Sequence, residues 1–242
     1  MIGGAGPLSP PGSAEVLEAF AHEQLAVANI ADLDHHFEDL IDLVDVAMNA
    51  DPAVAGPLRH QLREIAGRVP APSLVVYCHL SDGHALLDRS VSEPDFTTAR
   101  AHYERALDVA RDASDLQFET QALRAIALAA AGLGWPDALD RCHEALDALY
   151  EIRYWQKLWQ AIESTTLALA TMGRAADAAV LLGHLDAHVI AVGLEDGLDY
   201  RDRARALIDA DGGHLFARER GAHMSADELV AAAIGFCTTP LR

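Results

Sequence analysis

Basic residues are scarce in this 242-residue chain, which has 18 Lys and Arg against 37 Asp and Glu and a formal net charge of −19. Lys157 is its only lysine. Nucleic-acid binding requires clustered Lys and Arg that displace counterions from phosphates. An acidic chain presents the opposite field, and no local basic patch interrupts it. We therefore expect no direct contact with nucleic acid.

Cysteine is also scarce, and Cys78, Cys142 and Cys237 are far apart, with no CxxC motif. This excludes a disulfide framework and a cysteine zinc site, and it predicts free buried thiols in a reducing compartment. Residues 1–11 lack the basic and apolar regions of a secretory signal. The longest apolar run, residues 125–135, is too short to span a bilayer. We expect a cytoplasmic protein that makes no membrane contact.

The composition, 51% apolar, indicates a chain that buries a sizeable core. Residues 1–12 are rich in Gly and Pro, and we expect a disordered lead-in. Residues 13–68 read as helices that either extend a repeat array or cap it. Val69-Pro70-Ala71-Pro72 is the best linker, so that residues 73–242 form the main domain, ending in C-terminal capping helices.

Apolar residues recur at helical spacing along the whole chain, and the breaks fall at Gly and Pro. Leu74 to Tyr77 resembles a strand in isolation, but its place in the repeat described next favours a helix. The fold class predicted is all-α. After residue 52 the predicted helices cover residues 58–67, 73–88, 95–112, 116–132, 136–150, 154–172, 174–192, 199–210 and 225–236.

Three segments align in register, with the first Ala of each at Ala99, Ala138 and Ala178. Each keeps a small residue, a larger one four residues later, and Ala or Leu three further on. These positions share one helix face, where small residues let helices approach closely. The pattern resembles the second helix of the tetratricopeptide repeat (TPR), lengthened beyond the family's ~34 residues. It implies antiparallel helix pairs in a short solenoid; the alternative is an irregular bundle with coincidental spacing.

A further resemblance covers residues 73–236. Its elements, in order, are Tyr154-Trp155-Gln156-Lys157-Leu158-Trp159, then residues 167–183, an Arg-rich helix, residues 220–225 and residues 228–233. The run is similar to the TPR-like C-terminal region of large bacterial signal-transduction ATPases, which carry LuxR-type DNA-binding or cyclase domains. No GxxxxGK[ST] phosphate loop is present, and no helix-turn-helix or cyclase domain follows.

The resemblance implies the repeat module alone, in a bacterial transcriptional regulator. The predicted function is a non-enzymatic protein-interaction or sensory module without a cofactor. Its groove would hold a protein partner, a peptide or a small effector. The rival hypothesis is an all-α small-molecule or metal-dependent enzyme that uses clusters of His and Asp.

Two histidine clusters are the candidates for that rival chemistry. His184 and His188 stand four residues apart and can share a helix face, but the Glu of an HExxH motif is absent. We therefore assign no metal site and keep this pair as a weak candidate. His35 and His36, beside Glu38, point about 100° apart on a helix, which disfavours chelation from one side.

Aromatic residues are the main candidates for partner contact. Trp155 and Trp159 share a helix face, and Tyr154 lies directly upstream. They form either a core wedge between repeats or an aromatic anchor for a partner. Tyr103, at the larger position of the first repeat, is a further candidate. The Arg-rich helix, Arg201 to Arg205, is interpreted as a solvated face.

Residues 226–236 are strongly apolar. This helix either folds back on the last repeat or leaves part of its face exposed to a second copy. Screening limits the repulsion from the acidic surface to about 8 Å at physiological salt. The sequence therefore favours a homodimer.

Overall fold

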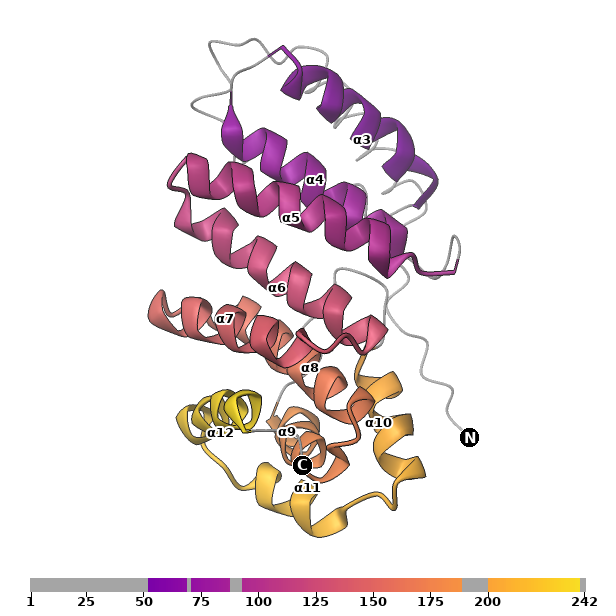
Figure 1. Cartoon of the computed structure of the whole chain (residues 1–242), viewed down its shortest axis with the longest axis vertical. Helices are drawn as coiled ribbons and strands as arrows, with labels where there is room; N and C mark the ends of the chain where they lie inside the picture. The colour runs from indigo at the N-terminus through magenta and orange to yellow at the C-terminus, as the bar shows by residue number, and fades with distance from the viewer. Residues whose placement is uncertain (1–51, 69–70, 88–92, 189–199, 240–242) are drawn as a thin grey trace, which may run out of the picture. The chain divides into compact units, whose positions relative to one another are not determined.

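The structure is a computed structural model that describes residues 52–68, 71–87, 93–188 and 200–239. Every regular element in this part of the chain is an α-helix (Figure 1), so the predicted all-α class is confirmed. The lead-in at residues 1–12, most of the segment 13–68 and the cluster at His35 lie outside the described residues. The helices are α3 (Pro52–Ala66), α4 (Pro72–Leu87), α5 (Phe96–Asp112), α6 (Leu116–Leu133), α7 (Ala138–Glu151), α8 (Trp155–Thr171), α9 (Ala175–His188), α10 (Tyr200–Ala210), α11 (Leu215–Ala222) and α12 (Ala226–Thr238).

The chain divides into two compact units, residues 1–74 and 75–242. The boundary falls close to the predicted linker, although it lies inside α4 rather than at the prolines. In the first unit, α3 begins at Pro52 and contains Pro57, so it starts six residues before the helix predicted over residues 58–67. Pro52 occupies the first position of the helix, where its missing N–H has no intrahelical partner, whereas Pro57 lies in the helix interior.

Helix starts in the second unit follow local capping chemistry. The Asp95 carboxylate accepts from the Thr98 N–H at 3.0 Å, and Asp115 accepts from Phe118 at 3.1 Å. Ser225 and Glu228 form a reciprocal capping box at the start of α12. These side chains satisfy backbone donors that the helix leaves unpaired. The predicted starts near residues 95, 116 and 225 are therefore correct to within a residue.

The turns of the second unit repeat at a 39-residue step. Ser114 and Arg153 both adopt positive φ, at 56° and 58°, in the α5–α6 and α7–α8 turns. Gly134 and Gly173 do the same, at 63° and 76°, in the α6–α7 and α8–α9 turns. The closing hydrogen bonds match as well: Asp115 N to Ala110 O corresponds to Tyr154 N to Leu149 O, and Trp135 N to Ala130 O corresponds to Arg174 N to Leu169 O. The backbone thus follows the periodicity seen in the sequence.

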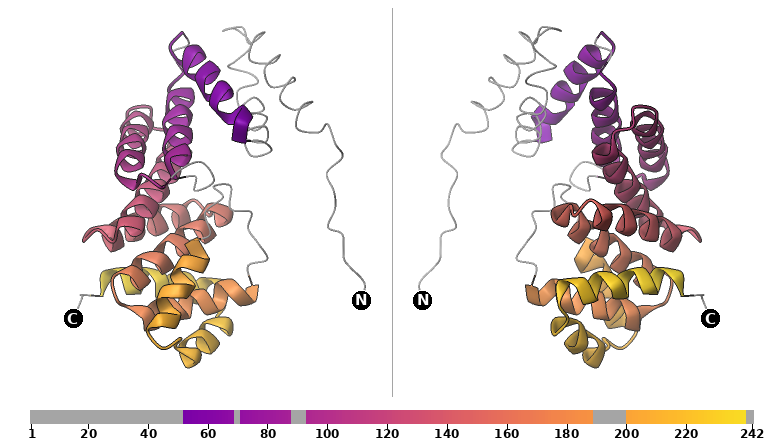
Figure 2. Two further views of the ribbon diagram at one scale, coloured as in Figure 1. Left: turned by 90° about the vertical axis from the view of Figure 1, so that its right-hand side faces the viewer. Right: turned by 90° about the vertical axis from the view of Figure 1, so that its left-hand side faces the viewer.

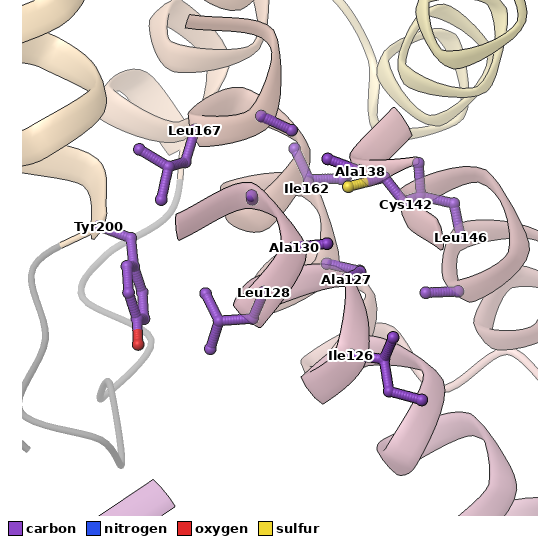
Figure 3. Packing of buried hydrophobic residues seen from close by; sticks show 14 of the residues in the cluster. Ile126, Ala127, Leu128, Ala130, Ala138, Cys142, Leu146, Ile162, Leu167 and Tyr200 are labelled. Carbon is purple, nitrogen blue, oxygen red and sulfur yellow. The ribbon is translucent and has the colours of Figure 1, made fainter. Parts of the chain in front are cut away.

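The helix face predicted from the repeat is the buried face of α5, α7 and α9. All nine positions of the pattern have no exposed surface, including the pairs Ala99 and Ala106, and Ala138 and Ala145. They belong to one hydrophobic core that continues through α6 and α8 (Figure 3). Small residues at these contacts allow the helices to pack closely.

The C-terminal helices close this unit. Helix α12 lies back against α7, α8 and α9 (Figure 2), with Leu229, Val230 and Ala233 buried. Its large apolar side chains are thus used within the chain, as expected of a cap. Helix α11, which the sequence did not predict, packs on α9, while α10 packs on α8 and α9.

Candidate functional site

Four of the eight Tyr and Trp residues of the chain lie within residues 150–159, around the turn between α7 and α8. Tyr150 ends one helix and Trp155 begins the next, while Arg153 adopts φ 58° between them. Trp159 follows one helical turn after Trp155. All four aromatic residues (Tyr150, Tyr154, Trp155 and Trp159) are partly buried and pack against the core.

The rings of Tyr150, Trp155, Trp159, His184 and His188 form a continuous series, here called the aromatic row. Tyr150 meets Trp155 edge to face at 6.1 Å between centroids, and Trp155 lies 6.1 Å from Trp159. Trp159 stacks on His184 at 5.7 Å with an interplanar angle of 19°. His184 lies 4.5 Å from His188. The row therefore joins α7, α8 and α9 through contacts at favourable aromatic separations.

Both ends of the aromatic row are held by polar contacts. The Arg153 guanidinium lies 4.4 Å from the centroid of the Tyr150 ring, and the Tyr150 hydroxyl donates to Asp227 at 3.2 Å. At the other end, His188 Nε2 donates to the Ala222 carbonyl at 2.6 Å. Because Asp227 belongs to α12 and Ala222 to α11, the C-terminal helices help to fix the orientation of the row.

His184 is the most buried member of the row, at 3% exposure. Its burial, and then the nearby His188, lower the pKa of His184 below the usual 6.5, against an opposing effect of the Gly221 and Met224 backbones. Burial disfavours the charged imidazolium. His184 is therefore neutral at physiological pH and behaves as a polarisable aromatic ring in the stack.

The structure brings Trp155 and Trp159 together, as the sequence predicted, and Tyr154, directly before α8, packs partly buried against the core. Tyr103 does not join them, and its side chain is fully buried. Its ring fills the space above Gly83, where an added Cβ would lie only 2.3 Å from the ring. The correct reading of Tyr103 is a core residue at the contact between α4 and α5.

The weak metal candidates, His184 and His188, belong to the aromatic row. In the described ranges, no three His, Cys, Asp or Glu side chains gather in a group able to hold a metal ion. Sequence reasoning missed their place beside Trp159. The repeat register was the available signal, because it sets α9 next to α8.

The Arg-rich helix α10 is not a solvated face. Arg201 pairs with the buried Glu163 of α8 through its Nε at 3.2 Å. Arg203 Nη2 donates to the Gly132 carbonyl at 2.9 Å, and its guanidinium lies over the Phe96 ring. Arg205 pairs with Asp186 at 2.7 Å. The hydrogen bonds of these arginines attach α10 to helices that lie 19 to 71 residues earlier, and the Phe96 contact reaches α5.

Two of the buried thiols, Cys142 and Cys237, offer no ready nucleophile. Burial raises the pKa of Cys237 to about 12, and it raises that of Cys142 further. A thiolate is the reactive form of cysteine, so both side chains stay protonated and inert near neutral pH.

Comparison with protein-family models, curated proteins and solved structures gives no match to this chain. Within the described part of the chain, every helix falls short of the length and apolar character needed to cross a membrane.

Proposed function

We propose that this chain is a non-enzymatic interaction module whose TPR-like helix pairs present the aromatic row to a protein partner or peptide. The observation that carries the proposal is the row itself: Tyr150, Trp155 and Trp159 are partly exposed, yet each ring is fixed by its neighbours. Trp and Tyr are enriched among residues that dominate binding energy. A pre-ordered ring also loses little conformational entropy on binding.

The helix arrangement supports the same proposal. A 39-residue step relates the turns after α5 and α7, and the buried face of α5, α7 and α9 follows the repeat pattern. Stacked helix pairs of this kind form extended binding surfaces. The resemblance to bacterial ATPase-linked regulators suggests a place for the module in cytoplasmic signal transduction, where its partner would belong to the transcriptional machinery.

A comparison of single variants tests this proposal. Immobilised wild-type chain, Trp155→Ala and Leu116→Ala are exposed to native lysate of the source organism, and bound proteins are identified by mass spectrometry. Leu116 is the matched control, because it is a large apolar residue 52% exposed and outside the aromatic row. We expect a protein that wild type and Leu116→Ala retain and Trp155→Ala loses, with unchanged circular dichroism in all three.

Two outcomes contradict the proposal. One is a set of bound proteins that Trp155→Ala retains as well as wild type does. The other is stoichiometric zinc, iron or manganese that resists dialysis of the purified chain, which would favour the metal-dependent enzyme instead.

A further inference from the structure

A separate candidate site, made of polar side chains, lies on α6 and α8 away from the aromatic row. Leu128 of α6 and Leu167 of α8 point toward Tyr200 (Figure 3), and this face of the two helices is called the inner face. The two leucines stand one 39-residue step apart. The C-terminal ends of α6 and α8 meet, since a Cβ added at Gly134 would lie 2.7 Å from Thr171 Cγ2. The helices therefore run in parallel, and residues 39 apart occupy equivalent positions.

Arg124 and Glu163 are such an equivalent pair, each one turn before the leucine of its helix. Residues four apart share a helix face, so both lie on the inner face. Glu163 is paired with Arg201, which follows Tyr200 in α10. Its negative charge is thus matched by α10.

Arg124 has no comparable ion-pair partner among the described residues. Its side chain is only 5% exposed, and its Nε has no hydrogen-bond partner. Among the residues that the structure describes, no carboxylate forms an ion pair with it. A largely buried guanidinium with no anionic partner is unfavourable. This is the more notable in a chain of net charge −19, where carboxylates are abundant.

Gln160, three residues before Glu163, adds a second group that lacks a partner. It is 5% exposed, and its Oε1 accepts no hydrogen bond. Buried amides are rarely left in this state. The inner face thus offers a cationic donor that needs an oxyanion and a neutral acceptor that needs an O–H or N–H.

We propose that the inner face binds a small molecule that carries a carboxylate or phosphoryl group next to a hydroxyl or amino group. Arg124 takes the oxyanion through its planar fork of donors, and Gln160 accepts from the neighbouring O–H or N–H. This site does not depend on the aromatic row, so the proposed protein interaction can fail without affecting it.

Thermal denaturation of the full chain at constant ionic strength tests the proposal with four probes. Malate and glycerol 3-phosphate carry both groups, whereas succinate and inorganic phosphate carry the oxyanion alone. A ligand that binds only the folded state raises the midpoint with the logarithm of its concentration. We expect malate to raise the midpoint more than succinate does, or glycerol 3-phosphate to raise it more than inorganic phosphate does, each measured relative to sodium chloride.

Three variants locate the effect. Arg124→Gln should weaken binding by about tenfold or more, the loss expected for a charge-assisted hydrogen bond. Gln160→Leu should keep the response to the oxyanion but remove the preference for the hydroxylated probe. Arg220→Gln, at an exposed arginine of α11, should respond as wild type does.

Arg124→Met provides a readout that needs no ligand. Removing an unmatched buried charge should raise the midpoint in anion-free buffer and abolish the response to all four probes. The proposal is overturned if none of the probes shifts wild type beyond sodium chloride, or if Arg124→Gln and Arg220→Gln respond equally. It is also overturned if Arg124→Met lowers the midpoint in anion-free buffer.

Discussion

At the scale of single residues, His184 couples stability to pH. Its folded pKa lies below the ordinary 6.5 because burial and His188 disfavour the imidazolium. As pH falls through 6.5, the unfolded state takes up a proton before the folded state does. The stability contributed by neutral His184 is therefore complete above that pH and is lost as pH falls toward its folded pKa.

We expect urea unfolding to give a lower midpoint at about pH 5.5 than at about pH 7.5, with His184→Phe showing a smaller difference between the two. His79 shifts in the same direction, through its own burial and then His102, so part of the pH dependence should survive in the variant. His60→Gln is the control, because His60 is 70% exposed. Equal pH dependence in wild type and His184→Phe would contradict the assignment.

At the scale of elements, the crossing of α9 and α11 depends on two glycines. A Cβ added at Gly183 would lie 2.0 Å from the Arg218 carbonyl oxygen, and one at Gly221 would lie 1.8 Å from that of Val180. Each glycine thus admits the backbone of the other helix. This close approach places the Ala222 carbonyl within reach of His188 and so helps to fix the aromatic row.

Gly183→Ala should therefore destabilise the fold by about 1–3 kcal/mol, the range for overpacked contacts. Alanine would otherwise favour a helix by about 1 kcal/mol over glycine. Gly235→Ala in α12 measures the gain in helix propensity alone, because nothing lies within 4 Å of its added Cβ. This variant should therefore stabilise the fold. Denaturant titration of both variants measures the two effects; a stabilised Gly183→Ala would show that α9 and α11 are not in such close contact.

At the scale of the whole molecule, the homodimer stays a prediction, but α12 is not its source. Leu229 and Val230 of α12 are buried and Ile234 and Phe236 pack partly buried against the core, whereas Leu215 and Phe216 of α11 are 78% and 89% exposed. Adjacent exposed apolar side chains of this size are typical of contact surfaces. We expect association, where it occurs, to bury this pair.

Light scattering at micromolar concentration should then give a mass above the 25.9 kDa of one chain. The double variant Leu215→Ser and Phe216→Ser should return the mass to that of the monomer. Added salt should favour association, because it screens the repulsion between two chains of charge −19. A wild-type mass near 25.9 kDa under these conditions would contradict the dimer.

The sequence by itself determined the helices of the second unit and the face that most of them bury. Spacing of 3.6 residues, caps such as Asp95 and Ser225, and glycines such as Gly134 act within a few residues of one another. The 39-residue repeat carried the same local information from one helix pair to the next. For this reason the burial of Ala99, Ala138 and Ala178 was predictable, as was the pairing of Trp155 with Trp159.

Only the tertiary structure decided which side chains from different elements meet. In the folded chain His184 stacks on Trp159, Glu163 forms an ion pair with Arg201, and Arg124 has no ionic partner among the described residues. It also buried Tyr103 over Gly83. These outcomes depend on how closely helices cross and on which residues face one another across distances of about 20 to 70 positions in the chain. Local periodicity cannot predict such contacts. It shows which face of each helix is buried, but not which residues of another helix pack against that face.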